Sequence, residues 1–462
     1  MTRPTLQRHL GLWSAVLLVV GSVIGSGIFM KPLEISRSLP SEAWIFGGWA
    51  LLGVICLFGA FAYGEMGALF PEAGGQYAFL RESWGPFVAF LYGWCLLLVI
   101  NTGTLAALAV VFSSNLAKIV PMQTEPVWAT SWGVSLTVQD LIGISMIVSL
   151  AVVNHFGVRW GALFQNVSTT AKLLALGAIV VGGFFAFDAD VEAPPTDAVA
   201  PPMPDLVSGM VIAAVALFWA YEGWHQLAFS AAEMKDPKRD IGRGLIIGIV
   251  VLVVTYLAVN AVYLHVIPLE EMRRYGGDAD VPHAAMVRIF GGAAGSWFAA
   301  LICLSVYGAS NPNMLSAPRA FYAMAKDGAV PEVLTRVHSR WRTPHVAIWV
   351  QTAWAVLLLF LLKTFENLTE FVVFAALIFY ALVVAGVFAL RRRKPDLDRP
   401  FRCPGYPVTP LLFIAVVLFV DIRLLMQEDD RDNALKGLVI IGAVVLAWPV
   451  KQWFSARSRG VD

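Results

Sequence analysis

Two apolar runs of this 462-residue chain are interrupted by residues that a membrane-buried helix disfavours. The first run, VVGSVIGSGIFMKP, contains Gly21, Gly25 and Gly27. The second run, ALFWAYEGWHQLAFSAAE, contains Glu222, Gly223 and His225. A glycine costs about 1 kcal/mol relative to alanine inside a helix, and an ionisable residue at mid-membrane costs at least a few kcal/mol. The sequence therefore predicts that both runs lose their helical backbone within the membrane.

A broken helix exposes backbone groups of both signs, which suits a zwitterionic ligand. The N-terminal ends of the second half-helices, near residues 26–28 and 224–225, can hold a carboxylate. The carbonyls that end the first half-helices, near Val23 and residues 219–222, can accept hydrogen bonds from an ammonium group. The glycines alone also fit a second interpretation, in which they form a small-residue face for close helix packing. Two matched breaks, one of which carries Glu and His, favour the ligand site.

Composition places these runs in a membrane protein. Hydrophobic residues make up 58% of the chain and charged residues only 14%, whereas soluble domains carry about 25% charged residues. A spanning helix needs about 20 apolar residues, and the chain supplies about twelve such stretches. They centre on residues 12–36, 44–69, 86–117, 139–155, 161–187, 206–232, 241–266, 293–323, 346–363, 369–390, 408–426 and 434–453. We expect an all-α membrane protein with twelve transmembrane helices.

The distribution of charge predicts the orientation. Cytoplasmic loops of membrane proteins retain Lys and Arg, and residues 187–205, between the fifth and sixth stretches, contain neither. If the N-terminus is inside, the cytoplasmic side holds Arg81, Arg159, Lys235, Lys238, Arg239, Arg319, Lys326, Arg340, Arg342, Arg391, Arg392, Arg393 and Lys394. Both termini are therefore expected in the cytoplasm, with the chain in the cell's inner (plasma) membrane. The net charge of +1 leaves no electrostatic footprint for nucleic acid.

The two interrupted stretches begin two sets of five. Because five is odd, a set that begins with the sixth helix must enter from the opposite face of the membrane. The sequence therefore predicts an inverted repeat, with a first half over residues 1–200, a second over 201–392, and two further helices and a cytoplasmic tail over 393–462. Transporters with such repeats place their substrate between discontinuous helices at corresponding positions.

Several motifs resemble the L-type amino acid transporters of the amino acid, polyamine and organocation superfamily. They are GSVIGSGIF at 21–29, AYGEMGALFPEAGGQYAFLRESWG at 62–85, AKLLAL at 171–176, FWAYEGW with AAEMKDPKRDI at 218–241, and RRRKPDLDRPFRCPGYPVTP at 391–410. The resemblance implies a LeuT-like fold, a five-plus-five inverted repeat with helices 1 and 6 broken. It also implies sodium-independent transport, commonly by exchange of one amino acid for another.

The resemblance also assigns substrate-binding residues. From the first helix these are Val23, Ile24, Gly25, Ser26 and Gly27. From the sixth they are Trp219, Ala220, Tyr221, Glu222 and Gly223. Trp219 is expected to close over bound substrate, and the alternative for it is a packing or lipid-facing tryptophan.

Lys172 stands about halfway along the fifth stretch, with no acidic residue near it in sequence. The resemblance implies that its ammonium occupies the place of a cation in sodium-coupled relatives and reaches carbonyls at the first-helix break and on the eighth helix. A snorkelling lysine near a helix end is the alternative. If the first interpretation holds, transport persists when choline replaces sodium.

Three further residues are candidates for gating or coupling. Glu222 could contact a substrate ammonium, accept a proton or cap the broken helix, and the sequence leaves these roles open. His225 fits a structural hydrogen-bonding role better than a coupling role. Asn311 lies mid-way along the eighth helix with Asn313, where Pro312 can kink the helix and free a carbonyl toward Lys172.

Other partners and activities are not expected. Animal members of the family join a glycoprotein through a cysteine between the third and fourth helices, and residues 118–136 contain no cysteine. We expect no disulfide-linked subunit, no cofactor and no metal, because the four cysteines lack metal-ligand spacing. HExxH, nucleophile-elbow and P-loop motifs are absent from the sequence, which argues against an enzyme or an ATP-driven pump.

The expected function is sodium-independent exchange of small or medium neutral L-amino acids by alternating access. Proton-coupled symport is the alternative within transport. A channel would need a continuous polar pore, whereas the polar residues here converge on one depth.

Overall fold

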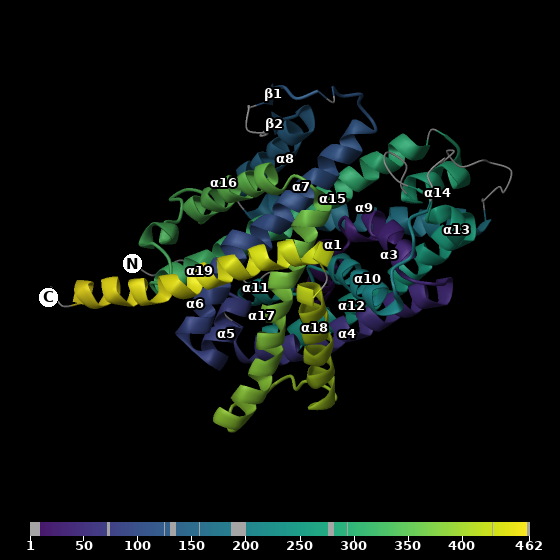
Figure 1. Ribbon diagram of the computed structural model, residues 1–462. Helices are drawn as coiled ribbons and strands as arrows, with labels where there is room; N and C mark the ends of the chain where they lie inside the picture. Colours follow the sequence, from purple (N-terminus) through teal and green to yellow (C-terminus); the bar gives the residue numbers. More distant parts are fainter. Residues whose placement is uncertain are drawn as a thin grey trace.

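The structure is a computed structural model, and it describes residues 10–71, 74–123, 125–129, 135–156, 158–185, 200–275, 281–292, 294–426 and 428–459. Almost all of the described chain is helical, and one short antiparallel hairpin, β1 (Trp128–Ala129) with β2 (Ser135–Leu136), is the exception to a helical bundle (Figure 1). The all-α prediction is therefore confirmed.

The first half of the chain follows the predicted stretches. Its helices are α1 (Leu12–Val23), α2 (Gly27–Met30), α3 (Pro32–Ser38), α4 (Glu42–Leu69), α5 (Gln76–Trp84), α6 (Pro86–Cys95), the π-helical turn η1 (Leu96–Ile100), α7 (Asn101–Ala117), α8 (Val138–His155) and α9 (Val158–Phe185). Local chemistry starts α8, where Thr137 and Asp140 form a capping box.

The second half begins with another interrupted helix. Its elements are α10 (Leu206–Ala220), α11 (Gln226–Phe229), the 3₁₀ turn η2 (Ala231–Glu233), α12 (Pro237–Val266), α13 (Leu269–Met272), α14 (Val281–Phe290), α15 (Ala294–Lys326), the 3₁₀ turn η3 (Glu332–Thr335), α16 (His345–Leu362), α17 (Phe365–Arg393), α18 (Val408–Met426) and α19 (Glu428–Arg459). Asp205 caps α10 by accepting from the backbone N–H groups of Val207 and Ser208, both at 3.1 Å.

The membrane-spanning character differs among these helices. Within the described residues, nine helical segments are long and apolar enough to cross a membrane, with α1 and α2 counted as one, and α10 and residues 434–449 are shorter apolar helices. The break cuts α10 to 15 residues. Another long helix, α15, has 33 residues but carries Asn311, Asn313 and Arg319. These polar residues explain why it differs from a purely apolar span. The chain is thus a multi-pass helical membrane protein.

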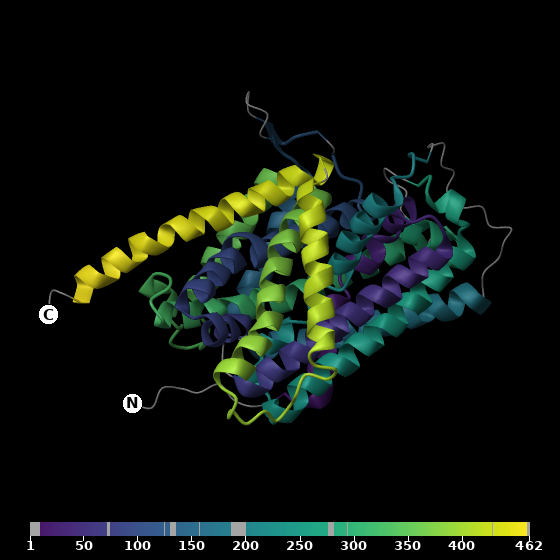
Figure 2. The ribbon, with the colours of Figure 1, turned by 60° about the horizontal axis from the view of Figure 1, so that its bottom comes forward.

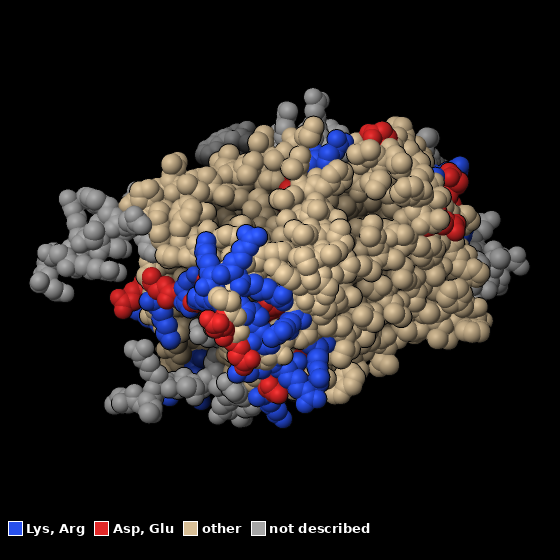
Figure 3. Space-filling model, turned by 90° about the horizontal axis from the view of Figure 1, so that it is seen from below, with Lys and Arg blue, Asp and Glu red and all other residues tan. Residues whose placement is uncertain are grey.

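The two broken helices lie inside the bundle. Helix α12 packs along both α4 and α1, and α1 also packs on α9 and α15. Helices α17 and α18 run side by side and are joined at one end by a linker over residues 394–407 (Figure 2). Lys and Arg side chains gather at one end of the molecule, among a largely uncharged surface (Figure 3). The exposed cations of the linker and the preceding turn are Arg392, Arg393, Lys394 and Arg402.

Candidate substrate site

Both predicted interruptions are present in the backbone. Helix α1 ends at Val23 and α2 begins at Gly27, while α10 ends at Ala220 and α11 begins at Gln226. The two breaks approach each other closely, because a Cβ on Gly27 would lie 2.3 Å from the Cα of Ala220. Gly223 has a φ of +117°, and a Cβ there would lie 2.7 Å from the Ser22 carbonyl oxygen. Glycine is therefore needed at both contacts.

A small cavity lies where the breaks meet. Its lining comprises Ser22, Val23, Gly25, Ser26, Gly27, Thr104, Leu108, Trp219, Glu222, Gly223, Ala309 and Asn313. Its volume is about 20 Å³, which is enough for a water molecule but not for an amino acid. In this structure the cavity is therefore too small to hold an amino acid.

Seven of the ten predicted substrate-binding residues line this cavity. The other three, Ile24, Ala220 and Tyr221, are buried beside it. The Tyr221 hydroxyl donates to the Trp49 carbonyl on α4 at 2.9 Å, so its side chain is directed toward α4.

Trp219 joins the two broken helices across the cavity. Its indole N–H donates to the Ser26 hydroxyl at 3.0 Å. On its other side the ring meets Phe365 of α17 edge to face, with centroids 5.6 Å apart. Trp219 is 4% exposed, so it is a packed wall of the cavity and is not lipid-facing.

Lys172 reaches the end of the first broken helix. Its Nζ donates to the Gly21 carbonyl at 3.1 Å and to the Ile24 carbonyl at 2.7 Å, and the residue is 1% exposed. A lysine buried to that degree is not snorkelling. The predicted contact with a carbonyl near Pro312 is not among its hydrogen bonds in the described part of the chain. Helix α15 instead packs against the lysine stem, because a Cβ on Gly308 would lie 3.3 Å from its Cε.

Tyr256 of α12 bridges the two breaks from the opposite side. Its hydroxyl lies 2.9 Å from the Ala220 carbonyl and 3.3 Å from the Val23 carbonyl. These carbonyls end α10 and α1, where a helix has no internal donor left. One hydroxyl has one proton, so it satisfies one of the two carbonyls at a time. Nothing in the sequence pattern marks Tyr256, apart from its being a buried polar group in an apolar helix.

Glu222 forms a cluster with two other polar side chains. The Tyr380 hydroxyl of α17 donates to Glu222 Oε1 at 2.5 Å and lies 3.0 Å from His225 Nδ1. Glu222 Oε1 is also 3.4 Å from His225 Nδ1. The carboxylate therefore lines the cavity while being held from the α17 side. Tyr380, like Tyr256, has no local signal in the sequence.

The two asparagines of α15 have different positions. Asn313 lines the cavity and accepts from Gln226 Nε2, in the first turn of α11, at 2.7 Å. The Asn311 carbonyl oxygen instead accepts from Asn154 of α8 at 3.0 Å. Asn311 thus lies outside the cavity lining, and Asn313 is the asparagine that is placed to meet a ligand.

Polar contacts also connect the residues that follow the second break to distant parts of the chain. The Leu10 N–H donates to the Glu233 carbonyl at 3.0 Å, and the Lys235 N–H donates to the Leu10 carbonyl at 2.9 Å. The Glu233 carboxylate pairs with Arg319 of α15 at 2.7 Å. Glu233 therefore pairs with a distant helix and not with the cations of its own segment.

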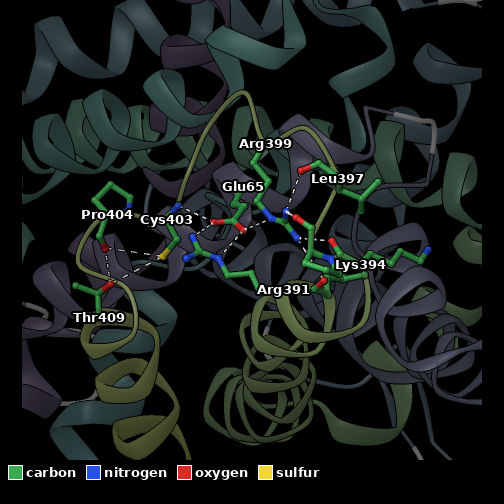
Figure 4. Close-up of polar contacts among 10 residues, drawn as sticks. Glu65, Arg391, Lys394, Leu397, Arg399, Cys403, Pro404 and Thr409 are labelled. Atoms are coloured by element: carbon green, nitrogen blue, oxygen red, sulfur yellow. Dashed lines mark hydrogen bonds and ion pairs between the residues drawn. The ribbon is translucent and has the colours of Figure 1, made fainter.

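A buried carboxylate anchors the linker between α17 and α18 (Figure 4). Glu65, near the end of α4, is 1% exposed and accepts from Arg391 Nε at 3.0 Å and Nη2 at 2.6 Å. It also accepts from the Cys403 N–H at 2.7 Å, and Arg399 Nε lies 3.5 Å away. Burial raises the pKa of the Cys403 thiol to about 11. The linker is therefore held by a paired carboxylate, beside a thiol that stays protonated at neutral pH.

Comparisons with known proteins agree with this arrangement. Residues 10–445 match the amino acid permease family. The serine/threonine exchanger SteT of Bacillus subtilis (strain 168) is 32% identical over 417 residues, covering 90% of each chain. The human b(0,+)-type amino acid transporter 1 is 28% identical over 453 residues, covering 96% of this chain and 87% of that protein. The rat large neutral amino acids transporter small subunit 2 is 29% identical over 430 residues, covering 89% and 76%.

The family match spans nearly the whole chain, including both breaks and every helix that lines the cavity. The relatives are named as transporters or exchangers of amino acids. The chain therefore belongs to the amino acid permease family and is a membrane transporter rather than an enzyme.

Proposed function

We propose that this protein is a sodium-independent exchanger of small or medium neutral L-amino acids, working by alternating access. The observation that carries the proposal is the cavity between two broken helices, with the Lys172 ammonium bound to the carbonyl end of one of them. In this scheme the substrate carboxylate lies at the N-terminal ends of α2 and α11. The substrate ammonium donates hydrogen bonds to carbonyls at the ends of the first half-helices, at Val23 and in the last turn of α10 at Trp219.

Lys172 supports independence from sodium. A cation that coordinated the Gly21 and Ile24 carbonyls would compete with an ammonium group that already lies 3.1 and 2.7 Å from them. The lysine supplies a fixed positive charge there, so no ion has to enter with the substrate.

Trp219 and the neighbouring helices support alternating access. The cavity is too small for an amino acid in this closed arrangement, so binding requires the walls to separate. Trp219 is linked to Ser26 by one hydrogen bond and to Phe365 by an edge-to-face contact. Such contacts can break and reform without unfolding either half-helix.

The remaining features of the scheme are part of the proposal. The twelve helices form two inverted repeats over residues 1–200 and 201–392, followed by residues 393–462. The protein lies in the plasma membrane with both termini in the cytoplasm, which agrees with the exposed Lys and Arg gathered at one end of the molecule (Figure 3). It works without a disulfide-linked subunit, and its described cysteines are all buried.

The lining of the cavity favours small substrates. Thr104, Leu108, Ala309 and Asn313 face the space that a substrate side chain would occupy, and Asn313 offers an amide beside apolar walls. Serine, threonine and alanine are therefore the first substrates to test. One of the relatives is named as a serine/threonine exchanger, which supports testing these substrates first.

Proton-coupled symport is a second candidate, because Glu222, His225 and Tyr380 form one cluster at the cavity. A carboxylate that carries a proton with the substrate would make uptake depend on an imposed pH gradient. Glu222→Gln keeps the side-chain shape and removes the charge. If uptake by this variant is unchanged across pH, Glu222 caps the broken helix. If the wild type accumulates substrate under a pH gradient and Glu222→Gln does not, symport is established.

Purified protein in liposomes tests the exchanger directly. Vesicles preloaded with unlabelled serine should take up labelled serine several-fold faster than empty vesicles, at the same rate in sodium and in choline buffer. Uptake that is independent of internal serine would refute exchange. Uptake that is lost in choline buffer would refute sodium independence.

A further inference from the structure

A second cavity lies on the lipid-facing side of the molecule, at the seam between α4 and α10. It has a volume of about 390 Å³, within the usual range for ligand pockets. Its lining is Leu39, Ala43, Trp44, Gly47, Gly48, Leu51, Leu52, Met210, Ala213, Ala214 and Leu217. No charged residue is among them, so the cavity offers nothing to a zwitterion, and it is distinct from the substrate cavity.

The cavity opens toward the surrounding lipid. Leu51 is 56% exposed on α4, and Met210 is 41% exposed on α10. The same two helices present Val54 and Val207 to the outside, so the cleft, which we call the α4–α10 cleft, is continuous with an apolar surface that the bilayer covers. Trp44 stands near the start of α4 and is 43% exposed, and tryptophan is enriched at the ends of membrane-spanning helices.

The lining and the surroundings of the cleft indicate its occupant. None of its lining residues is charged, so it offers no partner to a lipid headgroup or to a charged segment. An acyl chain is wholly apolar, and the membrane supplies it at high concentration to a cleft that opens on an apolar surface.

The floor of the cleft is part of the broken helix. A Cβ on Gly48 would lie 3.2 Å from Leu217 Cδ1, so the two helices touch at this point. The Leu217 carbonyl accepts from the Tyr221 N–H at 2.9 Å, and Trp219 lies in the same final turn of α10. Anything that fills the cleft therefore contacts the turn that carries a wall of the substrate cavity.

We propose that the α4–α10 cleft binds an acyl chain of a membrane phospholipid, and that its occupancy restrains the last turn of α10 against α4. The binding part stands apart from the proposed exchange function. The restraint part rests on that function, because it acts through the opening of the substrate cavity.

Two glycines offer a matched pair of variants. A Cβ on Gly47 meets nothing within 4 Å, so Gly47→Leu should fill the cleft without a clash. Gly177, on the exposed face of α9, also has nothing within 4 Å and does not line the cleft. Both changes add the same bulk to an exposed glycine within a helix and also raise helix propensity. Gly177→Leu is thus the control. Ala214→Leu fills the cleft from α10 if Gly47→Leu does not fold.

Binding is measured with a phospholipid that carries a photoactivatable diazirine in its acyl chain. The protein is reconstituted with this lipid, irradiated, digested and analysed by mass spectrometry. Labelling should concentrate on residues 39–52 and 210–217, and should fall several-fold in Gly47→Leu but not in Gly177→Leu. Equal labelling of the wild type and Gly47→Leu would overturn the proposal, as would an absence of labelling at these residues in the wild type. This readout needs no transport, so it is independent of the exchanger assay.

The restraint is measured as the rate of exchange in the same liposomes. Gly47→Leu acts as a permanent occupant and should exchange more slowly than Gly177→Leu. Equal rates in the two variants would overturn the restraint. If the wild type and both variants all show no exchange, the proposed function is refuted.

Discussion

Lys172 and Tyr256 satisfy the carbonyls that the breaks leave without helical donors. Lys172 donates to Gly21 and Ile24, and Tyr256 lies within reach of Val23 and Ala220. Unsatisfied buried carbonyls are costly, so these two residues make an interrupted helix tolerable in the membrane. In the proposed exchange mechanism they also determine which carbonyls remain for a substrate. At the residue scale, the site depends on a few hydrogen-bond donors from unbroken helices that meet backbone carbonyls of the broken helices.

Lys172→Met should lower uptake about 10-fold or more, because a hydrogen bond to a charged group contributes about 1.5–3 kcal/mol and the variant removes two. The methionine keeps the length of the stem, so packing against Gly308 is retained. Initial uptake rates in liposomes measure the effect. Lys326→Met removes an exposed lysine at the end of α15 and is the control. Equal uptake by the two variants would exclude a role for the Lys172 ammonium at the break.

Tyr256→Phe should lower uptake and reduce the unfolding free energy by about 1–3 kcal/mol, since it leaves a buried carbonyl unpaired. Tyr221→Phe is a matched control, because its hydroxyl also donates to a backbone carbonyl at 2.9 Å but toward α4. A similar stability loss with normal uptake is expected for Tyr221→Phe. If both variants lose uptake in proportion to stability, Tyr256 has only a structural role.

Single residues differed in how well the sequence predicted them. Gly27, Trp219 and Lys172 could be located because each violates the composition of an apolar helix or belongs to a family motif. Tyr256 and Tyr380 could not, because a tyrosine in an apolar run is compatible with the interior, the lipid face or the interface. Their roles depend on which helix lies opposite, and that information is not local.

The breaks set the geometry of the elements around them. Gly27 meets the backbone of Ala220, and Gly223 meets the backbone of Ser22, so α1 with α2 crosses α10 with α11 at van der Waals distance. This crossing brings carbonyl ends and N–H ends from both helices to one cavity. Away from the breaks, Glu65 of α4 connects α4 to the end of α17 and to the linker, because it binds both Arg391 and the Cys403 N–H (Figure 4).

Gly27→Ala should abolish uptake, because its Cβ would lie 2.3 Å from the Ala220 Cα and a backbone must shift. Overpacking of this kind costs about 1–3 kcal/mol. Gly442→Ala, where a Cβ meets nothing within 4 Å, should leave uptake and thermal stability unchanged. Normal uptake by Gly27→Ala would show that the two breaks are not in close contact.

Glu65→Ala should destabilise the protein by about 3–5 kcal/mol, because it removes the buried acceptor that Arg391, Arg399 and the Cys403 N–H share. Glu82→Ala removes a partly exposed carboxylate that pairs with Lys394 at 3.2 Å, and should cost no more than about 1 kcal/mol. Thermal unfolding in detergent compares the two. Equal loss of stability would mean that the linker is not anchored through Glu65.

Elements were predictable where hydrophobicity alone determines them. The apolar stretches located every long helix, whereas the short helix α5 lies between the second and third stretches. The π-helical turn η1, helix α14 and the β1–β2 hairpin were not predicted. Each lies inside a long apolar run or in a polar connection, where hydropathy has no contrast, and η1 and α14 are positioned by packing against other helices.

For the whole molecule, the small cavity and the two sets of polar contacts around it correspond to one state of the transport cycle that we propose. In that proposal the cavity, about 20 Å³ in this structure, enlarges toward one side at a time. Glu233 with Arg319, and Leu10 with the segment after η2, hold the chain together below the second break. The twelve stretches and the matched breaks could be seen in the sequence, but the small volume of the cavity could not, because it depends on side-chain contacts between distant helices.

Competition by single-charge analogues tests whether the breaks hold a zwitterion. The amino acid that gives the strongest exchange in liposomes is compared with its methyl ester and with the analogue that lacks the amino group. Each analogue loses one set of charged hydrogen bonds, so each should compete about 10-fold to 100-fold more weakly than the parent. An ester or a deaminated analogue that competes as well as the parent would contradict the account.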